Sequence, residues 1–456
     1  MTLVSINPSN NEEIKSYREY SLKDIEKVLD KTFLDQQYWA KTDLTFRLEC
    51  IQEIICILKE KKKEFSRLIS LEMGKPFEQA KAEIEKCISL CEYYYISSPK
   101  FLEERIISDS NKKHFITFQP LGIILGIMPW NFPFWQVFRF AIPTVIIGNG
   151  VIIKHASNVQ GCAMEIEATF QNAGFPKHIF CNIPISRDKV KYIIKNPKIS
   201  ALSITGSTST GRSVAKLSGS LLKKTVLELG GNDPYLILDD ADLNKAVQSC
   251  IDGRILNTGQ SCISAKRIII TKKIYDLFIQ KLQNQLSKKI MGDPMDKVDI
   301  GPMVSVEARN RVHEQVLRSI ELGASLIIGG EIPNITGAFY PITLLGNVHP
   351  GMPAFDEEIF GPIFALVVAQ DENHAIKLCN HSQFGLGSAV FTKDFDKGEY
   401  IARTKLHAGI CFVNDFVKSD PRLPFGGIKD SGYGRELSMF GMMEFANIKT
   451  VSMSYD

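Results

Sequence analysis

Short apolar runs rich in β-branched residues recur along this chain, and segments with helical spacing of apolar residues separate them. The runs in the first half lie at 121–128, 151–154, 179–182, 201–205 and 226–229. The pattern restarts after Gly231, with runs at 235–238, 265–271, 325–328, 364–369 and 409–413. Strands that alternate with helices form a mostly parallel sheet with helices on both faces. We therefore predict the α/β class, with two doubly wound domains that meet near residues 228–231.

The chain of 456 residues is too long for one ordinary hydrophobic core, which also indicates more than one domain. We predict helices from 21 to 63 and from 76 to 95, with Ser21 and Asp24 as the cap of the first. Residues 111–119 alternate in polarity, as is typical of an extended hairpin arm. The predicted boundaries are 1–108 with 122–228 for the first domain, 229–427 for the second, and 109–121 with 428–456 for a small β arm and tail.

The bulk composition is that of an ordinary globular protein, with 44% hydrophobic and 23% charged residues. The 54 basic and 51 acidic side chains leave a formal net charge of +3, which gives no reason to expect nucleic acid or a membrane surface as a partner. The most apolar runs are interrupted by Gly and Pro and are too short to cross a bilayer, so we expect no membrane span.

The ten cysteines are scattered, with no Cys-x-x-Cys pair and no histidine spacing typical of zinc. We therefore expect reduced thiols and no metal site. Residues 1–7 lack a basic region followed by an apolar core, so we expect no secretory signal there. Both observations favour a cytoplasmic protein.

One of these cysteines, Cys262, has a sequence setting suited to chemistry. It follows Asn-Thr-Gly-Gln-Ser at 257–261, and these polar and glycine residues leave room for a reagent to reach the sulfur. A thiolate is the strongest nucleophile among ordinary side chains. The alternative is a buried residue that acts as a small hydrophobe, which is the commoner role of a single Cys.

Two further motifs supply partners for a nucleophile. Residues 225–231 (Thr-Val-Leu-Glu-Leu-Gly-Gly) are an apolar strand that carries the carboxylate of Glu228 to a glycine turn. Burial there would raise the pKa of Glu228 toward the working pH, as a general base requires; a structural acid bonded to an amide is the alternative. Residues 129–133 (Pro-Trp-Asn-Phe-Pro) present Asn131 either as an amide donor or as a helix cap.

These motifs resemble the aldehyde dehydrogenase superfamily, as do Glu-Glu-Ile-Phe-Gly-Pro at 357–362 and Pro-Phe-Gly-Gly at 424–427, and all stand in the family's order. The resemblance implies that the first domain is a Rossmann-like cofactor-binding domain and that the second is catalytic. It also implies that the arm and tail contact a neighbouring subunit in a homodimer or homotetramer.

The resemblance further implies a reaction through a thioester. The Cys262 thiolate attacks an aldehyde carbonyl, and the side-chain amide of Asn131 and the Cys262 backbone N–H stabilise the developing oxyanion. Hydride then leaves for a nicotinamide cofactor, and Glu228 activates the water that releases the acid.

The same resemblance implies which residues hold the cofactor. Gly206 and Ser207 lie between a strand and a helix and would approach its phosphates, although an ordinary capped turn explains them equally well. Trp130, Glu358 and Phe360 would lie near the nicotinamide and its ribose. For Glu358, a surface loop acid is the alternative.

Lys154 and Ser157 bear on the choice between NAD and NADP. A lysine at the position of Lys154 contacts the adenosine ribose in the family, whereas a solvated lysine at a strand end is the bland alternative. Many NAD-preferring relatives carry Glu three residues later, where a carboxylate repels a 2′-phosphate. Ser157 removes that repulsion, and Lys154 could pair with the phosphate. We therefore predict that NADP is accepted, and we favour it over NAD.

Three residues are candidates for contact with the substrate. Trp135 and Arg139 follow Asn131 by four and eight residues, so a helix would present all three on one broad face. Arg139 lies among apolar residues, where a guanidinium needs a carboxylate partner from the chain or from the substrate. Ser419 falls where the family's substrate loop lies, and it is either a hydroxyl donor or a turn serine.

An aldehyde at one end and a carboxylate at the other describe a short ω-semialdehyde. Residues 227–234 (Leu-Glu-Leu-Gly-Gly-Asn-Asp-Pro) and 431–436 (Ser-Gly-Tyr-Gly-Arg-Glu) are similar to the succinate-semialdehyde dehydrogenases. We therefore predict an NAD(P)-dependent enzyme that oxidises succinate semialdehyde.

Four alternatives to this prediction are left open. The substrate could be another ω-semialdehyde or a broad range of aldehydes. The thioester could pass to coenzyme A, although such relatives lack the base found at Glu228. A catalytically silent binding or structural protein on the same fold is the last alternative, and the joint presence of Cys262, Glu228 and Asn131 argues against it.

Overall fold

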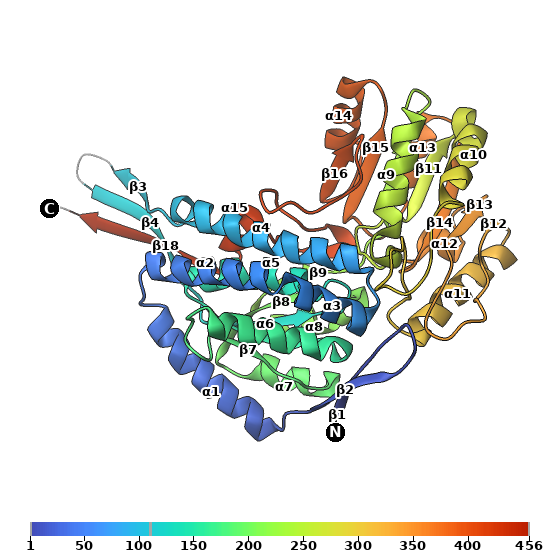
Figure 1. Cartoon of the computed structure of the whole chain (residues 1–456). Coiled ribbons are helices and arrows are strands. Elements are labelled where there is room, and N and C mark those ends of the chain that lie inside the picture. Colours follow the sequence, from blue (N-terminus) through green and yellow to red (C-terminus); the bar gives the residue numbers. More distant parts are fainter. Residues whose placement is uncertain (1, 109–111, 455–456) are drawn as a thin grey trace.

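The computed structural model describes residues 2–108 and 112–454, and Figure 1 shows two α/β units with a slender arm that projects from the first. A short hairpin of β1 (Thr2–Ile6) and β2 (Glu13–Arg18) precedes the first unit. The α/β class predicted from the sequence is confirmed. Residues 1, 109 and 456, at the ends of the predicted domain ranges, lie outside the described residues.

The sheet of the first unit has six strands in the order β17-β9-β8-β5-β6-β7. All neighbours pair in parallel except β17, which is antiparallel to β9. The parallel strands lie within about two residues of the five runs expected from the sequence, because strands covered on both faces are apolar throughout. Their bounds are β5 (Ile123–Met128), β6 (Gly150–His155), β7 (Phe180–Asn182), β8 (Ile199–Thr205), β9 (Lys224–Glu228) and β17 (Gly432–Tyr433).

Helices cover both faces of this sheet. Ile124 belongs to the core formed with α2 to α6, whereas Ile123 and Leu125 belong to the core formed with α1, α7 and α8, as strand alternation requires. Ser21 and Asp24 form a capping box at the start of α1, as predicted. The helices are α1 (Leu22–Trp39), α2 (Leu44–Glu60), α3 (Lys62–Met73), α4 (Phe77–Phe101), α5 (Trp135–Ile147), α6 (Gln160–Asn172), α7 (Val190–Lys195) and α8 (Thr208–Ser220).

The second unit has a seven-stranded sheet in the order β12-β13-β14-β11-β10-β15-β16, parallel except at β12. Its strands are β10 (Pro234–Ile237), β11 (Arg267–Thr271), β12 (Ser325–Ile328), β13 (Thr343–Gly346), β14 (Ile363–Ala369), β15 (Gly387–Phe391) and β16 (Ile410–Val413). Its helices are α9 (Leu243–Ile255), α10 (Tyr275–Leu286), α11 (Val306–Glu321), α12 (Pro353–Asp356), α13 (Glu372–Asn380) and α14 (Phe395–Thr404). The sequence did not predict β13 and β15, which are short and contain glycine.

The arm is a three-stranded antiparallel sheet of β3 (Arg105–Ser108), β4 (Lys112–Pro120) and β18 (Ala446–Ser454). Two predicted boundaries need correction. The first strand, β3, falls inside the predicted cofactor-binding range 1–108 but pairs with β4 in the arm. β17 falls inside the predicted tail, 428–456, but extends the sheet of the first unit beside β9. The last short helix, α15 (Ser438–Met443), lies between β17 and β18.

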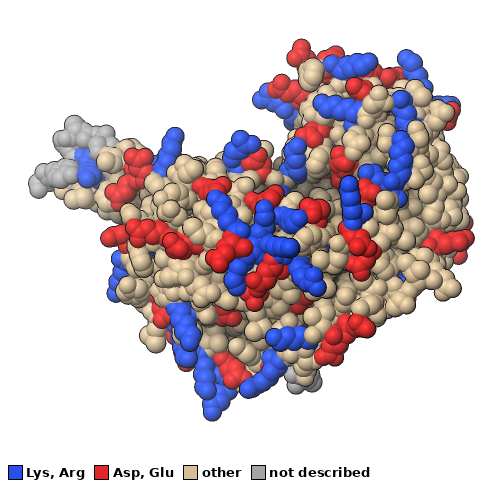
Figure 2. All heavy atoms as spheres, in the orientation of Figure 1, with Lys and Arg blue, Asp and Glu red and all other residues tan. Residues whose placement is uncertain are grey.

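Cationic and anionic side chains are interspersed over α2, α3 and α4 on the face drawn in Figure 2. Several of them form ion pairs between helices, such as Lys59 with Glu92 and Lys62 with Glu85. In the part of the chain that the structure describes, no helix is long and apolar enough to cross a membrane.

Candidate active site

The loop that carries Cys262 connects α9 to β11 and lies against the linker between the two sheets. A Cβ atom on Gly231 would come within 2.6 Å of the Cys262 carbonyl oxygen, so the linker packs closely on the loop. Within this loop, Asn257 and Thr258 adopt left-handed φ angles of 55° and 56°. Such a conformation is costly for a β-branched residue and persists only where surrounding contacts hold it.

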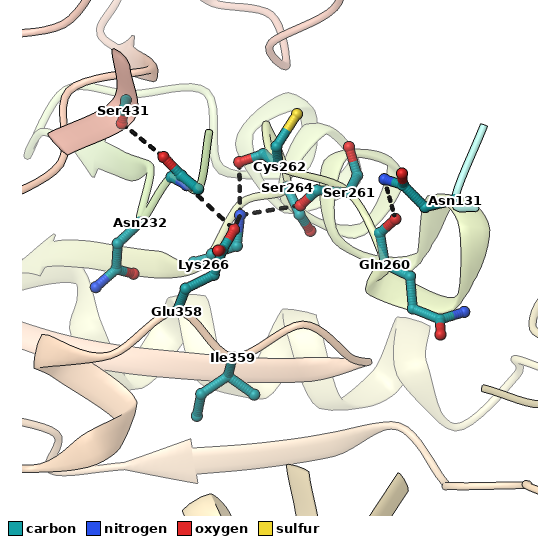
Figure 3. Close-up of polar contacts among 12 residues, drawn as sticks. Asn131, Asn232, Gln260, Ser261, Cys262, Ser264, Lys266, Glu358, Ile359 and Ser431 are labelled. Carbon is teal, nitrogen blue, oxygen red and sulfur yellow. Dashed lines mark hydrogen bonds and ion pairs between the residues drawn. The ribbon is translucent and has the colours of Figure 1, made fainter. Parts of the chain in front are cut away.

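Lys266 holds this loop in place through two hydrogen bonds, and the sequence analysis did not identify it as a functional residue. Its Nζ donates to the carbonyl oxygens of Ser261 at 2.9 Å and Cys262 at 2.6 Å. Figure 3 shows the Cys262 sulfur pointing away from Lys266, on the other side of the loop. Lys266 is 2% exposed, and hydrogen bonds from its charged ammonium group are strong because the protein interior has a low dielectric constant.

Asn131, which follows β5, meets the same loop from the first unit. Its Nδ2 donates to the carbonyl oxygen of Gln260 at 3.1 Å (Figure 3), and its Oδ1 accepts from Nε2 of Gln136 at 3.0 Å. Asn257 Nδ2 in turn donates to the Asn131 carbonyl oxygen at 2.7 Å. An amide nitrogen has two hydrogens, so this network fixes the Asn131 side chain and leaves one donor over.

Asn131 is not the cap of α5, which was the alternative reading of the motif. The N-cap position is Phe134, and Glu83 of α4 accepts from the backbone N–H groups of Phe134 at 2.9 Å and Trp135 at 3.0 Å. Glu83 also forms a buried ion pair with Lys75. Both side chains are about 1% exposed, so this pair ties α4 to the turn that carries Asn131.

Glu228 stands at the carboxyl end of β9 and is 2% exposed. Neither of its carboxylate oxygens has a hydrogen-bond partner among the described residues. Glycine at 426 leaves room for the carboxylate, since a Cβ atom there would lie 2.7 Å from Oε1. Burial raises the pKa of Glu228 well above the usual carboxyl range, and the charge of Glu436 raises it further, while Arg139 and Arg435 oppose the shift.

Arg139, which was predicted to contact the substrate, forms an ion pair with a carboxylate of the chain itself. Its guanidinium forms a buried ion pair with Glu436, donates to Thr205 Oγ1 at 3.3 Å and lies over the ring of Phe425. Its side chain is only 2% exposed. The carboxylate that a guanidinium needs in apolar surroundings is therefore supplied by the chain, which was the alternative left open. The structure thus shows the ion pair, and contact between Arg139 and the substrate stays a prediction.

The Cys262 thiol is half-buried, and burial raises its pKa to about 12. The positive charges of Arg139 and Lys266 oppose this shift, whereas Glu358 and Glu228 add to it. A thiolate therefore forms at this position only to the extent that nearby cations offset the cost of burial.

The residues predicted for the nicotinamide end of the cofactor lie together. The rings of Trp130 and Phe360 meet edge to face, with centroids 5.8 Å apart. Glu358 accepts from the Gly231 N–H at 3.1 Å and pairs with Lys266 at 3.2 Å, as Figure 3 shows for the lysine. Through Lys266, Glu358 is thus connected to the loop that carries Cys262 and is not an isolated surface acid.

The residues predicted for the adenosine and phosphate end lie at the carboxyl edge of the first sheet. Ser207 is the N-cap of α8, and its hydroxyl accepts from the Thr210 N–H. Gly206 has open space where a Cβ would point. Lys154, at the end of β6, is 7% exposed and has no ion-pair partner among the described residues. Its pKa is lowered to about 8 by burial and by the charge of Arg187, so a second cation acts on this position.

Trp135 and Ser419 are linked by a residue that the sequence did not single out. Lys86 of α4 donates to Ser419 Oγ at 2.5 Å, and its Nζ lies 4.4 Å from the centroid of the Trp135 ring. Ser419 thus contacts a cation from another part of the chain, whereas a serine that only stabilises a turn would bond to its own loop.

All ten cysteines are free thiols. Within residues 2–108 and 112–454, no group of three or more His, Cys, Asp or Glu side chains is arranged to hold a metal ion.

A thiol, an amide donor and a buried carboxylate at the junction of two α/β units are the features of one known family. The aldehyde dehydrogenase family profile matches residues 1–451, and the chain belongs to this family.

Individual relatives match over nearly the whole chain. The succinate semialdehyde dehydrogenase (NAD(P)+) of Escherichia coli (strain K12) is 41% identical, covering 98% of this chain and 97% of its own. The probable succinate-semialdehyde dehydrogenase (NADP(+)) of Synechocystis sp. is 38% identical, covering 99% of both chains. The crystal structure of succinic semialdehyde dehydrogenase from Streptococcus pyogenes in complex with NADP+ matches with a TM-score of 0.97 at 33% identity, covering 99% of this chain and 100% of that chain.

Proposed function

We propose that this chain is an NAD(P)-dependent succinate-semialdehyde dehydrogenase that works through a thioester on Cys262. The observation that carries the proposal is the meeting of three groups from distant parts of the chain. The amide of Asn131 is hydrogen-bonded to the loop of Cys262, and the buried carboxylate of Glu228, which has no hydrogen-bond partner among the described residues, lies close enough for its charge to act on the Cys262 thiol. Relatives named succinate-semialdehyde dehydrogenase, at 36–41% identity, support the choice of substrate.

In the first step, the Cys262 sulfur forms a bond to the aldehyde carbon, and the carbonyl π electrons move to oxygen. The Asn131 hydrogen that is not used by Gln260 and the Cys262 backbone N–H, which has no acceptor among the described residues, stabilise that oxyanion. When bound, the nicotinamide cofactor supplies the acceptor for the hydride, and an acyl-thioester remains on Cys262.

In the second step, Glu228 removes a proton from a water molecule, which attacks the thioester carbon. The carbon–sulfur bond breaks, the thiolate of Cys262 is restored and the carboxylic acid leaves. A carboxylate whose pKa is raised by burial is a stronger base than one in water, which suits this role. The presence of this base argues for release to water over release to coenzyme A.

The described residues fit an NADP cofactor. Lys154 has no anionic partner among the described residues, Arg187 lies close enough to act on its charge, and Ser157 brings no negative charge to the site. A 2′-phosphate would meet two cations there. The open space at Gly206 and the helix start at Ser207 suit the approach of the diphosphate.

Steady-state kinetics test the activity directly. We expect kcat/KM for succinate semialdehyde to exceed that for butanal, a neutral aldehyde of equal chain length, by about tenfold or more. The product should be succinate whether or not coenzyme A is added, and Cys262→Ala should abolish turnover. Equal efficiencies for the two aldehydes would mean a broad-specificity enzyme and would refute the proposed substrate.

The cofactor preference has its own test. Ser157→Glu places a carboxylate beside Lys154 and should reduce kcat/KM for NADP by about 10- to 100-fold while sparing NAD. Ser157→Ala is the matched control, because it removes the hydroxyl without adding charge and should retain the NADP preference. A wild-type enzyme that strongly prefers NAD would contradict the assignment.

We also propose a homodimer or homotetramer that assembles through the arm and tail. Ile106 and Ile107 of β3 and Ile448 of β18 are exposed by 58–64%, and exposed apolar strands favour burial against another chain. Ile448→Lys should shift the molar mass measured by light scattering toward the monomer. The cytoplasmic location that we propose is supported by the ten free thiols.

A further inference from the structure

Lys266 uses all three hydrogens of its ammonium group on partners around the loop of Cys262. Its Nζ donates to the carbonyl oxygens of Ser261 at 2.9 Å and Cys262 at 2.6 Å, and it pairs with Oε1 of Glu358 at 3.2 Å. An ammonium group has three donors and no acceptor, so these three contacts match its donors and fix the direction of the side chain.

The backbone of Lys266 is held by the second sheet. Its N–H donates to the carbonyl oxygen of Asp233 at 3.2 Å, and the N–H of Arg267, where β11 begins, donates to the same oxygen at 3.1 Å. Asp233 immediately precedes β10, which pairs with β11. Because the lysine extends from a regular element, it can hold the loop in one position relative to the sheet.

The bond to the Ser261 carbonyl also sets the direction of the Cys262 N–H. These two groups belong to one planar peptide unit, and the described residues contain no cis peptide bond. In a trans peptide the C=O and N–H bonds point in opposite directions. Since the carbonyl points toward Lys266, the Cys262 N–H points away from it, to the side on which Figure 3 shows the Cys262 sulfur.

Hydrogen bonds within the loop restrain this peptide unit only weakly. The Ser261 carbonyl oxygen accepts from the Ser264 N–H at 3.3 Å, which is long, and the Cys262 N–H has no acceptor among the described residues. The backbone is also strained nearby, since Thr258 has a left-handed φ of 56°. The shorter, charge-assisted bonds from Lys266 are therefore the main restraint on the direction of the Cys262 N–H.

We infer that Lys266 is a positioning residue that directs the Cys262 backbone N–H toward the oxyanion of the reacting carbonyl group. The inference rests on the proposed function and adds a role to the effect of the lysine's charge on the thiol. Each of the two proposed oxyanion donors then has its own support, because Gln136 orients the amide of Asn131. Such donors are effective when their direction is fixed before the negative charge develops.

The test compares two reagents for the Cys262 thiolate, without cofactor. With p-nitrophenyl acetate, the sulfur bonds to the ester carbon, the carbonyl oxygen becomes an oxyanion, and p-nitrophenolate leaves when the carbonyl re-forms. With iodoacetamide, the sulfur displaces iodide from a saturated carbon and no oxyanion forms. Both reactions use the same thiolate, so a change in its ionisation cancels in the ratio of the acylation rate to the alkylation rate. Cys262→Ala supplies the background rates.

Lys266→Met should lower this ratio by about 10- to 100-fold, because the Cys262 N–H is no longer held toward the oxyanion. Lys266→Gln loses the charge but keeps amide N–H donors, so it should recover part of the ratio. Lys223→Met is the matched control. Lys223 also donates to two backbone carbonyl oxygens, those of Ile194 at 2.7 Å and Asn196 at 2.6 Å, but at the amino ends of β8 and β9. Its ratio should stay within about twofold of the wild type.

Equal losses of acylation and alkylation in Lys266→Met would mean that the lysine acts only through the charge of the thiolate, and would overturn the inference. An equally low ratio in Lys223→Met would overturn it too. If Lys266→Met does not fold, the ratio of Lys266→Gln against that of the wild type decides. The proposed function is judged separately, by turnover of succinate semialdehyde. A wild type that oxidises only other aldehydes would refute that function, while the ratio would still report on Lys266.

Discussion

The side-chain amide of Asn131 donates a hydrogen bond to the carbonyl oxygen of Gln260 at 3.1 Å, across the junction of the two α/β units. The bond thus joins an amide of the first unit to the backbone of the second, two residues before the proposed nucleophile Cys262. The geometry of the proposed oxyanion site therefore depends on how the two units pack together.

Asn131→Ala should lower kcat by about 10²–10³-fold, because it removes one preorganised donor to the oxyanion. KM should change much less, since the donor acts mainly in the transition state. Gln136→Leu is a useful comparison. It removes the donor that orients Asn131 but leaves the amide itself, and its effect on kcat should be clearly smaller. An Asn131→Ala enzyme with nearly normal kcat would eliminate the amide from the mechanism.

Glu228→Gln should still form the acyl-enzyme and show a burst of reduced cofactor, followed by turnover that is slower by about 10²–10⁴-fold. Wild-type kcat should rise with pH as the Glu228 carboxyl loses its proton, because only the carboxylate accepts a proton from water. Glu436→Gln removes a neighbouring negative charge that raises the pKa of Glu228. That variant should move the rising limb of the pH profile to lower pH; a shift to higher pH would contradict the assignment.

Arg139→Gln should destabilise the protein by about 3–5 kcal/mol, because it leaves the buried carboxylate of Glu436 without its cation. Urea unfolding measures this change. The comparison is Arg212→Gln, which breaks an exposed pair with Asp430 and should cost less than about 1 kcal/mol. Any effect of Arg139→Gln on KM should be similar for succinate semialdehyde and butanal. A selective effect on the semialdehyde would support Arg139 as a substrate anchor.

Alkylation of Cys262 by iodoacetamide should be slow at neutral pH without cofactor and should accelerate as pH rises, because burial raises the thiol pKa to about 12. Lys266→Gln should slow it further, since that lysine's charge stabilises the thiolate and its Nζ holds the loop. Peptide mass spectrometry separates this thiol from exposed Cys56, which serves as the internal reference. Faster alkylation in Lys266→Gln would refute its electrostatic role.

Much of the fold was predictable because buried parallel strands are apolar along their whole length. The run at 151–154 and β6 (Gly150–His155) illustrate this agreement. β15 (Gly387–Phe391) escaped prediction because Gly, Ser and Ala interrupt its apolar pattern. β3 (Arg105–Ser108) was assigned to the wrong unit, because the residues of a strand do not indicate locally which sheet that strand will join.

The same division applies to the candidate site. Cys262, Glu228 and Asn131 stand in motifs whose composition points to chemistry, and the structure brings the loops and strand ends that carry them to one junction. Glu83, Lys86 and Lys266 carry no such motif, because a lysine or glutamate on a helix or before a strand is common in any sequence. Their roles depend on which backbone carbonyl, ring or carboxylate lies opposite them.

Local pattern and residue type were sufficient to predict the α/β class, the family and the residues capable of nucleophilic, acid–base and hydrogen-bonding chemistry. The partners of the buried charges, in contrast, became known only from the folded structure. Arg139 pairs with Glu436, which is nearly 300 positions away, while Lys86 donates a hydrogen bond to Ser419. Electrostatic pairing depends on distance in space and on burial, and neither is encoded in the neighbouring residues of the chain.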